Sequence, residues 1–390
     1  MTQDKTNKTL NVPPLRFPGF TDEWKEYSID EIANIYGRIG FRGYTSADLV
    51  EKGNGAISLS PSNITNNQLY TDKDNTYISF YKYEESPEIK IFVGDVIFVK
   101  TGSTVGKVAY VDYLECEATL NPQLVVFKDI KCVNYLFSQI LATNKIQQRV
   151  SKITVGGAVP TLSQTELGKV RLFLPGNQEQ SKIATLLSLI EKRIYSQNKI
   201  IEDLKKLKSA IYETIFNSMK GKMFSLADVA EIIKGKQLNG EFLTEIGDYY
   251  VMNGGAEPSG YYHAFNVSAN TISISEGGNS CGYIQWNSVP FWSGGHCYTL
   301  NIKDKSVENK YLYHYLKWSE PEIMKLRIGS GLPNIQKKDL ERVSIIIPTN
   351  STQKEIIDLV DSIDRKIDTE CSISLLLNRQ KSYLLSTLFI

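Results

Sequence analysis

The stretch Gly156–Ile194, GGAVPTLSQTELGKVRLFLPGNQEQSKIATLLSLIEKRI, occurs twice in the chain, and this repeat determines the predicted architecture. Its second copy, GSGLPNIQKKDLERVSIIIPTNSTQKEIIDLVDSIDRKI, occupies Gly329–Ile367, and the alignment extends without a gap to Phe216 and Phe389. The offset is 173 residues, and 17 of the 61 aligned positions are identical. Self-similarity at a fixed offset is the signature of a repeated structural unit.

The segments that precede the two copies are also alike, although they have diverged much further. The matching pairs are YSIDEIANIYGR from Tyr27 with FSLADVAEIIKGK from Phe224, GDVIFVKTGSTVGKV from Gly94 with ANTISISEGGNSCGYI from Ala269, and VNYLFSQIL from Val133 with NKYLYHYLK from Asn309. Each repeat is therefore predicted to be a globular α/β segment, then a strand bounded by proline, then a long helix.

Apolar residues recur in both long helices at alternating steps of four and three, which predicts a coiled-coil seam. The apolar seam residues are Ile183, Leu187, Ile190, Ile194, Ile201, Leu204, Ile211 and Ile215 in the first copy, and Ile356, Val360, Ile363, Ile367, Leu377, Leu384 and Leu388 in the second. Polar residues interrupt the seam at equivalent positions, Gln197 with Glu370 and Lys208 with Lys381, and we expect them to fix the register.

Matching seams favour pairing of the two helices, although each helix packing on its own globular segment is the alternative. A globular segment separates the helices in the chain, so the pair is expected to be antiparallel. About 38 residues at 1.5 Å per residue give a length of roughly 57 Å. The predicted fold class is α+β, with two similar α/β domains separated by two long antiparallel coiled-coil helices in a pseudo-twofold repeat. The expected boundaries are 1–22 (arm), 23–155, 156–221, 222–328 and 329–390.

Composition excludes several function classes. The net charge of +1 does not indicate a nucleic-acid partner, and no stretch approaches the ~20 apolar residues of a membrane span. The N-terminus has no apolar signal-peptide core, and the five cysteines are scattered without a C-x-x-C pair, which fits a cytoplasmic protein. The three histidines are not spaced like metal ligands, so we expect ordinary fold residues and no metal site.

A glycine-rich polar turn follows a predicted strand in each repeat, at Thr101–Lys107 and at Glu276–Gly282. The first turn superficially resembles a phosphate-binding P-loop, but only three residues separate Gly102 from Gly106, and Val108 stands where a hydroxyl is needed. In the second turn Tyr283 replaces Lys107. Glycines allow close backbone approach to a ligand, and polar side chains suit base edges and phosphates. Ordinary hairpin turns remain the alternative interpretation.

Catalytic motifs are missing or incomplete. NVPPL (Asn11–Leu15) and NPQL (Asn121–Leu124) each depart from the Asn-Pro-Pro-aromatic motif of adenine methyltransferases, and no glycine-rich cofactor loop of that class is present. A nuclease-like set of Asp74, Glu88 and Lys90 lacks a counterpart in the second repeat. No Ser/His/Asp grouping emerges. The sequence therefore predicts a chain without catalytic residues.

The repeat layout, LRFPGFTDEW (Leu15–Trp24) and the pattern ending in LFLPGNQEQ (Pro160–Gln180) resemble the specificity subunit of type I restriction–modification systems. The resemblance covers nearly the whole chain. It implies that each globular segment is a target-recognition domain for one half of a bipartite sequence in double-stranded DNA. It further implies that the helices space these domains and dock two modification methyltransferase subunits, joined by restriction subunits that translocate DNA.

The same resemblance implies a non-catalytic, cytoplasmic protein with no membrane partner. S-adenosylmethionine, ATP and Mg²⁺ are then expected on the partner subunits and not on this chain. Two other functions stay open: a nucleotide-binding enzyme that uses Gly102–Lys107, and a coiled-coil scaffold without DNA contact.

Turn chemistry selects the candidate DNA-contacting residues, because recognition domains diverge too far for contacts to be transferred from the family. In the first repeat they are Lys100, Thr101, Ser103, Lys107, Asn121, Gln123 and Lys152. In the second they are Lys236, Gln237, Asn253, Asn279, Ser280, Lys325, Arg327 and Ser330.

Overall fold

The computed structural model describes residues 11–71, 75–329, 331 and 333–390. The chain divides into two compact units: unit 1 is Met1–Ser196 with Ser374–Ile390, and unit 2 is Gln197–Ile373. Each unit therefore takes part of both long helices, α6 (Asn177–Asn217) and α11 (Asn350–Thr387). The two units are described in turn.

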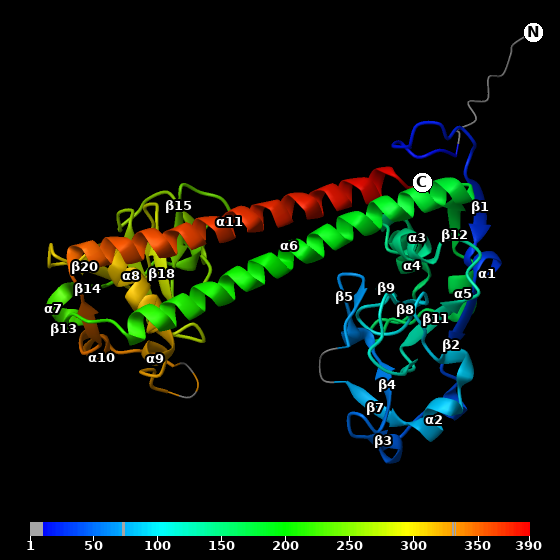
Figure 1. Ribbon diagram of the computed structural model, residues 1–390, viewed down its shortest axis with the longest axis horizontal. Helices are drawn as coiled ribbons and strands as arrows, with labels where there is room; N and C mark the ends of the chain where they lie inside the picture. Colours follow the sequence, from blue (N-terminus) through cyan, green and yellow to red (C-terminus); the bar gives the residue numbers. More distant parts are fainter. Residues whose placement is uncertain (1–10, 72–74, 330, 332) are drawn as a thin grey trace, which may run out of the picture. The chain divides into compact units, whose positions relative to one another are not determined.

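Unit 1 contains a six-stranded sheet in the order β2-β11-β8-β9-β6-β5, a four-stranded sheet in the order β10-β4-β7-β3, and a β1-β12 pair (Figure 1). Its strands are β1 (Lys25–Ser28), β2 (Asn34–Gly37), β3 (Leu49–Val50), β4 (Gly55–Leu59), β5 (Ile64–Thr65), β6 (Gln68–Leu69), β7 (Thr76–Ser79), β8 (Val96–Val99), β9 (Val108–Tyr110), β10 (Ala118–Leu120), β11 (Leu124–Lys128) and β12 (Arg171–Leu174). Strand β8 lies just before the first glycine turn, where a strand was predicted, and it is buried along its whole length. Its central position places the first glycine turn at the end of a rigid strand.

Short helices complete unit 1. They are α1 (Ile29–Ile32), α2 (Phe80–Glu84), α3 (Asn134–Leu141), α4 (Asn144–Ile153) and α5 (Gln164–Gly168), with single-turn helices at Gly40–Arg42, Ser46–Asp48, Pro61–Asn63 and Pro87–Ile89. Several begin at a Ser or Thr whose side chain satisfies an otherwise unpaired backbone N–H, as Ser163 does for Glu166.

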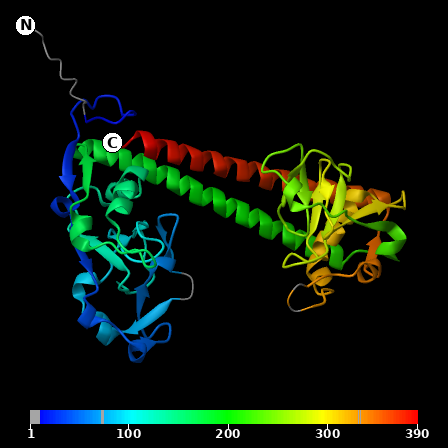
Figure 2. The same ribbon diagram turned by 180° about the vertical axis from the view of Figure 1, so that it is seen from behind.

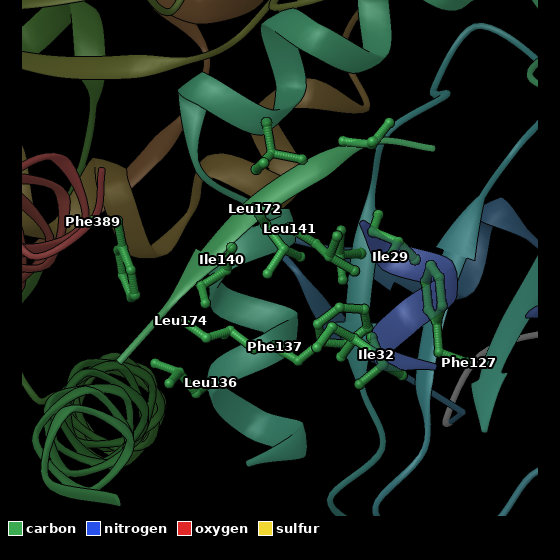
Figure 3. Close-up of a cluster of buried hydrophobic side chains, with 14 of the residues drawn as sticks. Ile29, Ile32, Phe127, Leu136, Phe137, Ile140, Leu141, Leu172, Leu174 and Phe389 are labelled. Carbon is green, nitrogen blue, oxygen red and sulfur yellow. The ribbon is translucent and has the colours of Figure 1, made fainter. Parts of the chain in front are cut away.

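The larger of two core clusters in unit 1 lies between α1, α3, β11 and β12, and the other includes Ile57, Leu59 and Ile97. Figure 3 shows side chains of these elements meeting in one cluster, which also receives Phe389 from the end of the chain: Ile29, Ile32, Phe127, Leu136, Phe137, Ile140, Leu141, Leu172 and Leu174. Trp24 packs edge-on against Phe389 with ring centroids 6.2 Å apart. The last residues of the chain therefore belong to the same core as its first strand.

Unit 2 contains a four-stranded sheet in the order β14-β20-β17-β18, a three-stranded sheet in the order β16-β15-β19, and a β13-β21 pair. Its strands are β13 (Lys222–Ser225), β14 (Ala230–Lys234), β15 (Tyr249–Met252), β16 (Gly260–Tyr262), β17 (Thr271–Ser275), β18 (Ile284–Asn287), β19 (Trp292–Ser293), β20 (Cys297–Ile302) and β21 (Ser344–Ile347). Its shorter helices are α7 (Leu226–Val229), α8 (Asn309–Trp318), α9 (Glu320–Met324) and α10 (Lys337–Glu341), with a single turn at Gly240–Phe242.

An aromatic cluster marks the core of unit 2. Phe216, near the end of α6, packs against Tyr311, Tyr315 and Trp318 of α8 with ring centroids 5.3–6.2 Å apart. Tyr212, one turn earlier, hydrogen-bonds the buried His314 through its hydroxyl at 2.9 Å. The end of α6 is thus part of this core, and the expected repeat of strand, helix and globular segment is confirmed.

Within each unit the parts of α6 and α11 lie side by side and run in opposite directions (Figures 1 and 2). Both helices begin at an Asn two residues after a Pro. Every apolar residue of the predicted seam is buried or partly buried. The polar seam positions also engage across the pair: Lys208 donates to both carboxylate oxygens of Asp364 at 2.5 and 2.7 Å, and Lys381 donates to Glu191.

Candidate nucleic-acid interface

The glycine turn of unit 1 joins β8 to β9 and is held almost entirely by backbone hydrogen bonds. The N–H donors and their C=O acceptors are Val99 to Lys107, Lys100 to Gln123, Gly102 to Pro160, Val105 to Gly102, Gly106 to Val99, and Leu162 to Lys100, with N···O distances of 2.8–3.1 Å. Gly102 and Gly106 have φ angles of +105° and +99°, which residues with a side chain rarely adopt.

The glycine turn of unit 2 joins β17 to β18 and repeats this pattern bond for bond. The donors and acceptors are Ser275 to Tyr283, Glu276 to His296, Gly278 to Pro333, Cys281 to Gly278, Gly282 to Ser275, and Ile335 to Glu276, again at 2.8–3.1 Å. Gly278 and Gly282 also have positive φ angles, +78° and +91°. The side chains on the two turns differ at almost every position, so the repeats share a backbone frame and not a chemical surface.

Most of the predicted residues of unit 1 gather on this frame. Thr101 forms a bridge with Thr161, and Asn121 contacts Gln123 through both its amide oxygen and its amide nitrogen. Lys107 donates to the Ile64 carbonyl at 3.1 Å, so its ammonium is already engaged. Ser103 is exposed at the tip, and Lys100 is partly buried beside it. Lys152 is exposed in the last turn of α4.

The predicted residues of unit 2 fall into two groups. Asn253 accepts the backbone N–H of His296 at 3.2 Å, and Lys236 is tied by its backbone N–H to Ser293. The side chain of Gln237 packs against Gly295. A Cβ added to Gly295 would lie only 2.3 Å from the Gln237 amide oxygen. Asn279 and Ser280 lie on the turn itself. Lys325 pairs instead with Glu322 on α9, Arg327 is exposed beyond it, and Ser330 lies outside the described residues.

Sequence reasoning missed three residues that shape these turns. Gln147 of α4 donates to the Gly106 carbonyl at 2.8 Å and fills the space where a Cβ would stand. Glu276 is buried, and His296, which was expected to be an ordinary fold residue, is 62% exposed beside it. His296 lies 173 residues after Gln123, which is the offset of the repeat, and this spacing is the signal that could have identified the histidine.

The geometry of the first turn does not suit a nucleotide. A P-loop presents free backbone N–H groups to phosphate oxygens. Here the N–H groups of Gly102, Val105, Gly106 and Lys107 all bond to carbonyls of the chain itself, and the Lys107 ammonium is engaged by Ile64. The turn is therefore closed on its own backbone.

Other chemistry is also suppressed by burial. Burial raises the pKa of the Cys297 thiol to about 11 and raises that of Cys281, so both thiols remain protonated near neutral pH.

His314 lies with Asp361 and Asp364 in a cluster that geometrically resembles a cation site. Both imidazole nitrogens are engaged, however, and the ammonium of Lys208 occupies Asp364. Among the described residues, no helix is long and apolar enough to cross a membrane.

Each unit also has a groove beside its long helix, at equivalent places in the repeat. The groove in unit 1 has a volume of about 750 Å³ and includes Tyr110, Tyr135 and Ser188 in its lining. The groove in unit 2 has a volume of about 500 Å³ and includes Trp286 and Lys310. In unit 1 the Tyr135 hydroxyl donates to Glu191 of α6 at 2.7 Å, and burial raises the pKa of Tyr135 well above its ordinary value.

Comparisons with known proteins agree with this architecture. Relatives include a putative type I specificity subunit of Mycoplasma pneumoniae, 33% identical over 37% of this chain and 39% of that protein. A putative type I restriction enzyme MjaX specificity subunit of Methanocaldococcus jannaschii is 23% identical over 75% of this chain and 76% of that protein. The chain's match spans about two-fifths of the length of the first curated relatives.

Solved structures show the same fold. The crystal structure of a type I restriction–modification S subunit from M. genitalium aligns with a TM-score of 0.64 at 17% identity, covering 97% of this chain and 99% of that one. A second solved structure, reported for the complex assembly and conformational transition of the type I R-M system, aligns with a TM-score of 0.55 at 17% identity. The alignment covers 93% of this chain and 96% of that one.

The family model for the type I restriction modification DNA specificity domain matches twice, at residues 21–206 and 220–379. The two matches correspond to the two repeats and include both glycine turns. The chain belongs to the type I restriction–modification DNA specificity family and carries two copies of its domain.

Proposed function

We propose that the chain is the sequence-reading subunit of a type I restriction–modification complex, with one glycine turn for each half of a bipartite DNA target. The observation that carries this proposal is the pair of turns with identical backbone hydrogen bonds and different side chains. A site for one common ligand would keep its side chains. A frame that must recognise a different half-site in each copy keeps its backbone and varies its base-contacting groups.

The near-zero net charge fits a subunit that shares DNA binding with partners. Phosphate contacts supply most of the affinity of DNA-binding proteins, whereas base contacts supply specificity. In this proposal the partners neutralise most of the phosphates. The recognition turns then need polar side chains, such as Ser103, Gln123 and Asn279, more than a strongly basic surface.

The partners in this proposal are two adenine-N6 methyltransferase subunits, with restriction subunits added in a larger cytoplasmic complex. The chain itself is non-catalytic, and the partners bind S-adenosylmethionine, ATP and Mg²⁺. Large apolar side chains exposed along the long helices support a docking role. They are Leu189, Tyr195, Ile200 and Leu207 on α6, and Leu359, Leu375, Leu376 and Tyr383 on α11.

Methylation mapping tests the proposal directly. The chain is expressed with its methyltransferase partner, and N6-methyladenine is located across the DNA of the cells. One interrupted sequence is expected. Replacing residues 23–155 by the same segment of another family member is expected to change one half-site only.

Two results would contradict the proposal. A change in both half-sites would show that the segments do not read DNA independently. An unchanged sequence after replacement of either segment would favour a scaffold without DNA contact. Tight ATP binding by the isolated chain, lost in Lys107→Ala, would instead favour the nucleotide-dependent alternative.

A further inference from the structure

His296 stands at the position of unit 2 that Gln123 occupies in unit 1. The backbone N–H of Lys100 bonds to the Gln123 carbonyl, and the N–H of Glu276 bonds to the His296 carbonyl, both at 2.9 Å. The side chain of His296 is exposed, while its backbone N–H is fixed by the Asn253 side chain at 3.2 Å. An exposed polar ring on a fixed backbone, beside the glycine turn, is well placed to meet a base edge.

The carboxylate of Glu276 lies directly behind this ring and is only half satisfied. Its Oε1 accepts from Lys234 Nζ at 2.6 Å and from the Tyr298 hydroxyl at 2.9 Å. Its Oε2 is buried and has no hydrogen-bond partner among the described residues. His296 Nδ1 lies 3.6 Å from Oε2, which is slightly too long for a hydrogen bond and within reach of a small rotation of the imidazole.

We propose that His296 is a specificity-determining residue of unit 2, positioned by Glu276, and that it accepts a hydrogen bond from the exocyclic amino group of an adenine or a cytosine. The inference rests on the proposed DNA-reading function. The buried Oε2 requires a donor, and the Nδ1–H of the ring supplies it. The bond made by one ring nitrogen sets the tautomer. Nε2 then presents its lone pair, which pairs with adenine N6 or cytosine N4 in the major groove.

Substitution of His296 separates base readout from other roles. Purified complexes with His296→Ala are compared with the unaltered complex by methylation mapping and by binding to synthetic duplexes. In His296→Ala the preference at one base pair of the unit 2 half-site is expected to relax. Removing the amino group of that base is expected to weaken binding of the unaltered complex on the order of tenfold, with little effect on the variant. His263→Ala, an exposed histidine outside the turn, serves as the control.

Glu276→Gln provides a sharper test of the positioning role. Lys234 and Tyr298 both donate to Oε1, so the glutamine oxygen must take that place, and its NH₂ group then faces Nδ1. Nδ1 becomes the acceptor, and the proton moves to Nε2. The preferred partner at the same base pair is expected to change from an amino group to an acceptor, such as guanine O6 or thymine O4. Loss of packing alone would lower binding without inverting this preference.

Several outcomes would overturn the inference. Unchanged specificity in His296→Ala would do so, as would an equal loss of binding on every sequence, which indicates a phosphate contact. If His296→Ala changed specificity only in the half-site of unit 1, the assignment of His296 to the half-site of unit 2 would be wrong. If the unaltered complex itself showed no sequence preference, the proposed function would fail, and the inference with it. If the unaltered complex is sequence-specific and His296→Ala keeps the same specificity, only the role of His296 is overturned and the proposed function stands.

Discussion

Gln197 of α6 donates its side-chain amide to the carboxylate of Glu370 on α11, and also to the Glu370 backbone carbonyl at 3.1 Å. The two residues occupy equivalent positions in the two repeats. The buried contact therefore joins the same seam position of α6 and of α11. Lys366 pairs with the same carboxylate from the exposed side. The hydrogen bond to Lys366, and then that to Gln197, hold the pKa of Glu370 below its ordinary value.

Removing only one partner of this contact is expected to lower the melting temperature of the protein. Gln197→Leu leaves the Glu370 carboxylate with Lys366 but without its amide donor on the buried side, and removing one partner of a buried polar contact costs more than the bond itself contributes. The double variant Gln197→Leu with Glu370→Leu is expected to recover or exceed the original melting temperature, because it extends the apolar seam. Thermal unfolding followed by circular dichroism measures both. Lys205→Leu, at an exposed position of α6, is the control, and a double variant less stable than Gln197→Leu would contradict the prediction.

Gly106→Ala is expected to disturb the recognition turn of unit 1 selectively. Its φ of +99° disfavours a side chain, and a Cβ would meet the Gln147 amide oxygen at 2.2 Å. We expect a loss of stability on the order of 1–3 kcal/mol and loss or relaxation of one methylated half-site. Gly157→Ala is the matched control, because its Cβ would meet nothing within 4 Å. Equal behaviour of the two variants in methylation mapping would contradict the prediction.

The organisation of the molecule follows from the sequence, because a gap-free repeat and a long apolar seam are signals that depend only on local periodicity. Strands β8 and β17, the long helices α6 and α11, and the positions of both turns are confirmed. The shared glutamines were informative as well. Gln180 accepts the N–H of Val133, and Gln353 accepts the N–H of Glu308, so each anchors the start of a short helix against a long one.

Site chemistry was harder to predict because it depends on contacts between distant segments. The sequence comparison set Val133 opposite Asn309, whereas the glutamine contacts set it opposite Glu308, one residue earlier. That shift places Gln139 opposite His314. Lys107 was selected from turn chemistry as a candidate DNA contact, and nothing local in the sequence predicts that its ammonium donates to the Ile64 carbonyl, 43 residues earlier in the chain. No periodicity in the sequence reports such pairs, and the same holds for Glu276 with His296.

The stability of unit 2 is expected to fall as the pH decreases from 6.5 towards 4. Burial lowers the pKa of His314 to about 4, with the nearby carboxylate of Asp361 opposing this shift. Between pH 4 and 6.5 the imidazole binds a proton more tightly in the unfolded chain than in the folded one. The contribution of the neutral imidazole to the free energy of unfolding is therefore complete above pH 6.5 and is lost progressively as the pH falls towards 4. The expected loss is on the order of 1–3 kcal/mol. Urea unfolding at pH 7 and 5 measures it through tryptophan fluorescence, since Trp286, Trp292 and Trp318 lie in unit 2.

His314→Gln is the control for this pH dependence, because glutamine is the residue at the equivalent position in unit 1. The variant keeps polar atoms for Tyr212 and Asp361 but cannot gain a proton in this range. Its unfolding midpoint should change less between pH 7 and pH 5 than that of the unaltered protein. An equal change in both proteins would assign the effect to other groups.

Partner docking is expected to depend on the apolar side chains that α11 leaves exposed in unit 1. Leu375 and Leu376 are 54% and 60% exposed beside the buried seam residue Leu377. Burying a leucine in an interface contributes roughly 1.5–3 kcal/mol, so the pair Leu375→Lys with Leu376→Lys is expected to weaken methyltransferase binding tenfold or more. Co-purification and titration measure the loss, and Cys371→Lys, an exposed position of the same helix, is the control. Undiminished binding with an unchanged melting temperature would place the docking surface elsewhere.

Shortening both long helices tests whether they set the spacing of the two half-sites. Deleting Ile194–Ile200 from α6 together with Ile367–Ile373 from α11 removes one heptad from each, takes out both partners of the Gln197–Glu370 contact, and spares the ion pairs Lys208–Asp364 and Lys381–Glu191. Seven residues of helix span about 10.5 Å, close to three base pairs at ~3.4 Å each. Methylation mapping is expected to show a spacer shorter by about three base pairs, or no methylation because the half-sites also rotate around the duplex. Deleting the α6 segment alone is the control, since it mismatches the seam and is expected to unfold the helix pair. An unchanged spacer in a folded, active double deletion would show that the helices do not set this distance.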